Sequence, residues 1–470
     1  MHGLPLQPVT VAAIALLGGV YLIRSRTSSK ARRPPGPTGL PLLGNILQAP
    51  VKPVFLIGDI RLAKEILEKR SAKFSSRPTI PYVRYHVDPR QVYWVFSEQN
   101  ETHFIGRKLT TGLMANVRAG ETEPLQQFDA LLNVTHLLDD GGKNWFHHID
   151  RVSASMVLSA AFGLHCPTGQ EPELKEILDC AAEIVSPMPW RKRAQTYRKR
   201  EDALYDKLIT RAISGEASGM NTWAAAFARE DKPEGDQRRL MNQFAGTAIS
   251  MHTFILACIL YPGWIPRAQK EIDAIVGEDR LPSFKDRPRL PYVEAIVRGM
   301  HFFRRLSDIV VMRLPDILAM HTAETLRWRP AVRFGVPHQS TADDVVEYKG
   351  KEYFIPKGSI IFAVFWAIEH EQERFENHDL FQPERFLDDT NNLKAGYETT
   401  DIAVCPGIPF AERSLWINIA MMLWTFNISG LEEPDSKTGL PFKYDDSDSA
   451  FSGEARNEQD VCTSDAHRVL

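Results

Sequence analysis

The 470 residues are enough for one large domain or for two or three average ones, with a sizeable core. The formal net charge of −3, with both signs mixed along the chain, gives no reason to expect a nucleic-acid partner. The five cysteines are odd in number and scattered, which suits a reducing compartment better than a disulfide framework.

Residues 1–25 predict a membrane anchor. No residue from Gly3 to Ile23 is charged, and about 21 residues of helix span roughly 31 Å, just enough to cross a bilayer. Because a basic cluster follows directly, the positive-inside rule places the bulk of the protein on the cytosolic face. A cleaved signal peptide is the weaker interpretation, since no small-residue cleavage site precedes the cluster. The basic and proline-rich residues 26–45 predict a stiff, extended hinge.

Helical periodicity dominates the rest of the chain. An apolar run from Val54 leads into an amphipathic stretch that ends near Leu67, which predicts a strand and then a helix, closed by a turn at 74–78. Further helices are predicted at 126–138, 146–162, 173–185, 197–213, 240–260 and 267–276. Short β-like runs lie at 345–355 and 359–365. The expected fold is therefore mainly α with a small β region.

Cys405 stands before a long apolar segment that we expect to be helical as far as Asn427. A thiol at the start of a helix tends toward the thiolate, because the free N–H groups and the positive end of the helix stabilise the anion. A thiolate can bind a metal or attack an electrophile. For an isolated Cys-Pro-Gly, however, a buried structural cysteine is the commoner role.

Four separated pieces of sequence change that balance: the basic-flanked anchor with its PPGP, Glu324-Thr-Leu-Arg327, Pro383-Glu-Arg-Phe386 and Cys405-Pro-Gly407. Together and in this order they resemble the cytochrome P-450 haem-thiolate monooxygenases, and the wider sequence is similar to the fungal microsomal members. The resemblance implies the cytochrome P-450 fold, with a single haem-binding domain at 46–470 behind an N-terminal transmembrane helix. It also implies haem b as the cofactor.

The same resemblance implies roles for individual residues. Cys405 would be the axial thiolate on the haem iron, a ligand that favours O–O cleavage. His338 would contact a haem propionate, and Arg107 matches the basic residue of the family's C-helix. The family's structural ion network beneath the haem, in which guanidinium groups clamp a carboxylate, is matched by Glu324, Arg327 and Arg385.

The chain departs from the family around the haem. Glu398, Asp401 and Ala403 replace the glycines and arginine expected before the cysteine; non-glycine residues do not easily take positive φ, and acids disfavour a thiolate. In the central helix the acid and alcohol that relay protons are missing, because neither Thr247 nor Thr253 has a neighbouring acid. We therefore assign no catalytic residue.

Two further departures concern length. The family's first strand and the helix before it are absent between Pro50 and Val51. Residues 299–323 interrupt a motif that would otherwise join Arg298 directly to Glu324, and Pro315 prevents them from simply lengthening a helix. We interpret this segment as an insertion of translated intron, because its excision leaves a perfect join. Sequencing the transcript tests this, since a majority message that contains the segment would contradict it.

The predicted function is insertion of one oxygen atom from O2 into an apolar small molecule, a secondary metabolite or a xenobiotic. Electrons would come from NADPH through NADPH–cytochrome P-450 reductase, at the endoplasmic reticulum membrane, with the catalytic domain facing the cytosol. The alternative is a catalytically impaired or non-enzymatic splice variant or relic that binds haem weakly or not at all. A cysteine-nucleophile hydrolase fits poorly, since no local signature pairs a base with Cys405. Three N-x-S/T triplets, at Asn100, Asn133 and Asn427, are expected to be chance matches.

Overall fold

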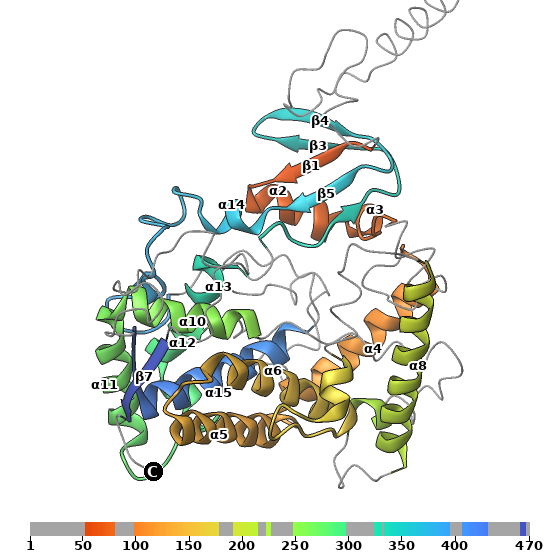
Figure 1. Ribbon diagram of the computed structural model, residues 1–470. Coiled ribbons are helices and arrows are strands. Elements are labelled where there is room, and N and C mark those ends of the chain that lie inside the picture. The colour runs from red at the N-terminus through yellow and green to blue at the C-terminus, as the bar shows by residue number, and fades with distance from the viewer. Residues whose placement is uncertain are drawn as a thin grey trace, which may run out of the picture.

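The computed structural model describes residues 52–79, 98–177, 191–214, 222–226, 248–297, 324–330, 333–394, 407–430 and 461–466. Figure 1 shows a large helical body with a small region of β-strands at one end. The predicted mainly α fold with a small β region is thus confirmed. The predicted anchor and hinge, residues 1–45, lie outside the described ranges. Within those ranges, no helix combines the length and apolar character needed to span a bilayer.

The β region is built around β5 (Ile360–Ala363), which pairs in parallel with β1 (Val54–Ile57) and antiparallel with β2 (His338–Gln339). The predicted run at 345–355 is a hairpin, because Lys349 and Gly350 take positive φ between its two strands. A small core of its own lies under these elements. The other elements of this region are β3 (Asp344–Tyr348), β4 (Lys351–Ile355), α2 (Ile60–Lys64), the π-helical turn Glu65–Lys69, α3 (Ser71–Phe74) and α14 (Phe365–Glu369).

The helical body is organised around α15 (Ile408–Thr425), whose described side chains are buried along nearly its whole length. It packs against α5 and α12, and α5 packs in turn against α6, as Figure 1 shows. The elements around it are α4 (Glu101–Arg118), α5 (Glu123–Asp140), α6 (Trp145–Phe162), α8 (Arg191–Ile213), α10 (Ala248–Leu260), α11 (Ile265–Val276), α12 (Pro291–Val297), α13 (Glu324–Trp328) and the 3-10 turns Pro262–Trp264, Arg287–Arg289 and Pro383–Phe386.

Two predictions of local structure need correction. Helix α15 ends at Thr425, not at Asn427, because Phe426–Gly430 forms strand β6, which pairs with β7 (Val461–Ala466). Helix α4 was not found from hydrophobic periodicity. It begins at Glu101, after Asn100, whose side chain accepts a hydrogen bond of 3.0 Å from the His103 backbone N–H and so caps the helix.

Helices α12 and α13 meet although 26 residues separate their ends in the chain. The Thr325 hydroxyl donates a hydrogen bond of 2.9 Å to the backbone carbonyl of Ile296, 29 positions earlier. Without the 25 residues 299–323 that separation would be four, which is the spacing at which a threonine hydroxyl bonds back within one continuous helix. The two helices therefore meet with the contact expected of one helix. Residues 299–323 themselves lie outside the described ranges.

One glycosylation triplet can be judged from burial. Asn133 is fully buried on α5, and its amide donates to Asn418 of α15 at 3.3 Å. A side chain in this position is not accessible to a glycosyl transferase in the folded protein.

Candidate functional site

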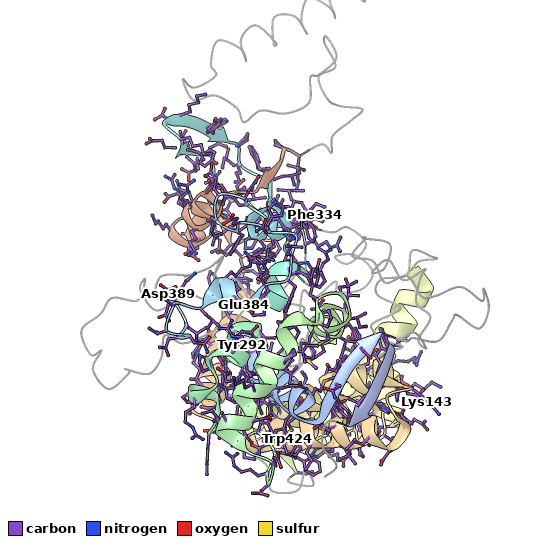
Figure 2. All side chains as sticks on the ribbon, turned by 90° about the vertical axis from the view of Figure 1, so that its left-hand side faces the viewer. Lys143, Tyr292, Phe334, Glu384, Asp389 and Trp424 are labelled. Atoms are coloured by element: carbon purple, nitrogen blue, oxygen red, sulfur yellow. The ribbon has the colours of Figure 1, made fainter. Side chains whose placement is uncertain are left out.

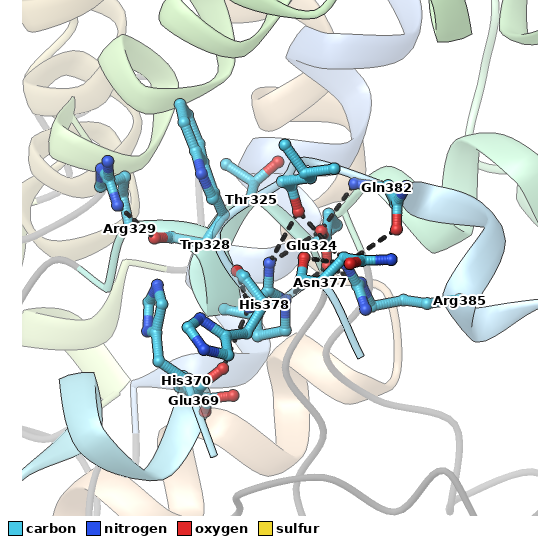
Figure 3. Close-up of polar contacts among 12 residues, drawn as sticks. Glu324, Thr325, Trp328, Arg329, Glu369, His370, Asn377, His378, Gln382 and Arg385 are labelled. Atoms are coloured by element: carbon cyan, nitrogen blue, oxygen red, sulfur yellow. Dashed lines mark hydrogen bonds and ion pairs between the residues drawn. The ribbon is translucent and has the colours of Figure 1, made fainter. Parts of the chain in front are cut away.

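Glu324, Arg327 and Arg385 form one buried ion network (Figure 3). The Arg327 guanidinium meets the Glu324 carboxylate through two parallel bonds, with Nε–Oε2 at 2.7 Å and Nη2–Oε1 at 2.9 Å. The Nε of Arg385 lies 3.1 Å from the same carboxylate. Glu324 and Arg327 are 0% exposed. The structure thus brings together the three residues for which the resemblance implied a structural network.

The network also fastens the loop segment before Pro383. Arg327 donates to the backbone carbonyls of Glu369 and His378 at 3.0 and 2.8 Å. Arg385 donates to the Glu376 carbonyl at 2.8 Å, and the Gln382 backbone N–H donates to Glu324 at 2.7 Å. The two guanidinium groups thus donate hydrogen bonds to backbone carbonyl oxygens as well as to the carboxylate. The network therefore fixes the path of the backbone before Pro383.

A second link ties the same segment to α12. Figure 2 shows Tyr292 of α12 beside Glu384 of the 3-10 turn Pro383–Phe386, and the Tyr292 hydroxyl donates to the Glu384 carboxylate. Burial, with this bond to Glu384, raises the pKa of Tyr292 far above its usual range. The phenol therefore stays a donor at any ordinary pH.

A cluster of basic side chains surrounds His338 at the start of β2. His338 is buried, and its Nδ1–H donates to the backbone carbonyl of Phe74 at 2.8 Å. Burial, together with the nearby charges of Arg77, Arg107 and His103, lowers its pKa from 6.5 to about 3. His103 and Arg107 stand four residues apart on α4, so they share one face of that helix. We term Arg77, His103, Arg107 and His338 the basic cluster.

The basic cluster matches an anionic group in charge. Arg77 is 7% exposed, and it donates to the backbone carbonyls of Val336 and Pro337 at 3.3 and 3.0 Å. The guanidinium groups of Arg77 and Arg107 would favour an anionic group beside them through charge-assisted hydrogen bonds. The two propionates of haem b are such a group, so the residues present fit the cofactor that the resemblance implies.

Cys405, the altered run 398–404 and Thr247 lie outside the described ranges, whereas α15 is described from its N-cap at Gly407 onward. Thr253 lies buried in α10, a helix that contains no acidic residue from Ala248 to Leu260. The described part of α10 therefore offers no acid that could act with an alcohol.

Two cysteines in the described ranges are poor candidates for thiolate chemistry. Cys166 and Cys258 are free and fully buried. Burial raises the pKa of the Cys166 thiol to about 12 and raises that of Cys258 well above its usual value. Both thiols stay protonated, so neither competes with Cys405 for a metal or a nucleophilic role.

The low pKa of His338 gives a prediction about acid stability. Between pH 6.5 and about 3 the unfolded chain binds a proton at this histidine and the folded chain does not, so the free energy of unfolding falls as the pH falls through that range. Replacing His338 with glutamine should reduce the slope of unfolding free energy against pH by the equivalent of about one bound proton. Denaturant titrations of both proteins between pH 7 and pH 4 measure this; identical slopes would contradict the lowered pKa of His338.

Comparisons with known proteins agree with these features. A family model described as cytochrome P-450 matches residues 241–319 and 316–443, two pieces that meet inside segment 299–323. Cytochrome P-450 monooxygenase 58 of Postia placenta is 30% identical, over 92% of this chain and 89% of its own length. Cytochrome P-450 monooxygenase peniB of Penicillium patulum is 29% identical, over 92% of this chain and 85% of its own length. A cytochrome P-450 monooxygenase of Armillaria gallica is 28% identical, over 93% of this chain and 91% of its own length.

Proposed function

Because the chain belongs to the cytochrome P-450 family of haem-thiolate monooxygenases, we propose that it places one oxygen atom of O2 on an apolar small molecule, a secondary metabolite or a xenobiotic. The observation that carries the proposal is the basic cluster, in which basic side chains from three distant parts of the chain come together. Bound haem would supply the activation of dioxygen. Arg77 and Arg107 would donate to its propionates, His338 would do so only in its protonated form, and Cys405 would ligate its iron.

The electrons would come from NADPH through a membrane-bound NADPH–cytochrome P-450 reductase. We place the protein at the endoplasmic reticulum membrane, anchored by residues 1–25 and with residues 46–470 in the cytosol. Support comes from the sequence, in which an uncharged run from Gly3 to Ile23 precedes a basic cluster and a proline-rich hinge. An apolar substrate would partition into the same membrane.

We further propose that residues 299–323 are an insertion within one helix of the family. Two independent observations support this. The Thr325 hydroxyl and the Ile296 carbonyl make the contact expected within one helix. The match to the family model also breaks inside the same segment.

A second candidate function is retained because one observation favours it. The described part of α10 carries no acidic residue, so the proton relay of an oxygenase has no acid there. A chain of this kind could fold, keep the ion network around Glu324 and yet turn over poorly. It would then be an impaired or non-enzymatic variant.

Turnover with isotopically heavy dioxygen distinguishes the two candidates. The full chain would be expressed in membranes with an NADPH–cytochrome P-450 reductase and incubated with a panel of apolar small molecules. The oxygenase proposal expects products that gain one heavy oxygen atom and that require NADPH. Haem-loaded protein that gives no labelled product from any compound would favour the impaired variant.

A further inference from the structure

A row of buried polar side chains joins α5 to α15, and we term it the polar seam. Its surroundings are otherwise apolar, as both helices contribute to the main hydrophobic core. A buried polar group is costly unless it is paired, and a paired one restricts how two elements can pack. The polar seam can therefore fix the position of α15 along α5 more sharply than apolar packing alone. It consists of Thr122, Gln126 and Asn133 on the α5 side and of Ser414 and Asn418 on α15.

Gln126 is the member that reaches the first turn of α15. Its Nε2 donates to the backbone carbonyl of Phe410 at 3.0 Å and to the hydroxyl oxygen of Ser414 at 2.8 Å. Its Oε1 accepts from the Thr122 hydroxyl at 3.1 Å, and the residue is 0% exposed. Both ends of the amide are thus engaged. Because Phe410 is the third residue of the helix, the bond to its carbonyl ties the start of α15 to α5.

Asn133 makes the corresponding contact about two turns further along α5. Its Nδ2 lies 3.3 Å from Asn418 Oδ1, and Asn418 donates to the Ser414 carbonyl at 2.8 Å. This pair is equally buried, yet it acts on the middle of α15 and not on its first turn. The polar seam therefore contains its own matched control.

We propose that Gln126 is a positioning residue that sets the place of the first turn of α15 and, through it, the presentation of Cys405 to the haem iron. The inference rests on the proposed function, because Cys405 precedes the helix by only a few residues of chain. A ligand works when the element that carries it is held to within about 0.5 Å. Two hydrogen bonds from a buried amide, one to Phe410 in the first turn and one to Ser414 a turn later, supply such a constraint.

The test is the substitution Gln126→Glu, which keeps the shape of the side chain and removes both donor bonds. Without haem, amide hydrogen exchange at 407–414 should speed up by about tenfold, because the two bonds that close this turn onto α5 are lost. With haem, the fraction of reduced, carbon-monoxide-bound protein that shows the thiolate-ligated Soret band should fall severalfold. Asn133→Asp is the control; it should speed exchange beyond Ser414 and leave that fraction unchanged.

If Gln126→Glu does not fold, Gln126→Met serves in its place, since it keeps the length without the donor or a charge. Wild-type exchange at 407–414 in Gln126→Met, together with a wild-type band, would overturn the inference. If the unmodified chain shows no thiolate band at all, the proposed function fails. Amide hydrogen exchange at 407–414, measured without haem, would still decide whether Gln126 holds the first turn of α15.

Discussion

Replacing Glu324 with glutamine is expected to lower the free energy of unfolding by about 3–5 kcal/mol. The change removes one negative charge from a place where Arg327 and Arg385 both meet it, and Glu324 and Arg327 are 0% exposed. Two guanidinium groups would then be left buried without their carboxylate. Their bonds to backbone carbonyls would have to hold the segment before Pro383 alone. The midpoint of urea unfolding, measured with the slope, gives the size of the effect.

The same substitution at an exposed carboxylate is the control. Glu347 lies on β3 with its side chain exposed, and Glu347→Gln should change the free energy of unfolding by no more than about 0.5 kcal/mol. If Glu324→Gln proved as mild as Glu347→Gln, the network would be an incidental contact and not a support of the fold.

Joining Arg298 directly to Glu324 is expected to stabilise the protein by about 3 kcal/mol. Closing a loop of 25 residues costs roughly that much in chain entropy, and the shortened chain can run through α12 and α13 as one helix. Urea unfolding of the shortened and unmodified chains tests this. Haem content per mole of purified protein should rise in parallel, because α13 carries Glu324 and Arg327.

A chain in which residues 299–323 are replaced by a glycine- and serine-rich linker of equal length separates the sequence of the segment from its length. If the segment only bridges the two helices, this chain should unfold close to the unmodified one. A shortened chain that unfolds at lower urea than the unmodified protein would mean that residues 299–323 contribute contacts to the fold.

A helix could be predicted from the sequence only where its buried residues are apolar and so give a hydrophobic periodicity. Helix α15 was evident because most of its buried positions are apolar. Helix α4 was missed because the buried positions of its first half are His103, Gly106 and Thr110, which have helical spacing without an apolar pattern. Apolar burial begins only at Leu113, so the periodicity is too short to detect.

The site was predictable to the extent that it uses short motifs. Glu324 and Arg327 lie in one helical turn, and their pairing follows from their spacing. Arg77 could not be found in this way, because it belongs to a turn without periodicity and joins His338 only when β2 is laid beside the 74–77 segment. Gln126 did carry a signal that was overlooked: it is a polar residue at a position where the predicted helix is buried.

The central claim is that this chain holds haem through the thiolate of Cys405, and the reduced, carbon-monoxide-bound absorption spectrum tests it most directly. Chain expressed with haem available should show a Soret band at the position of thiolate-ligated iron. Cys405→Ala, prepared in the same way and shown to be folded by its urea transition, should lack that band. A folded, unmodified chain without the band, or a Cys405→Ala protein that retains it, would contradict the account.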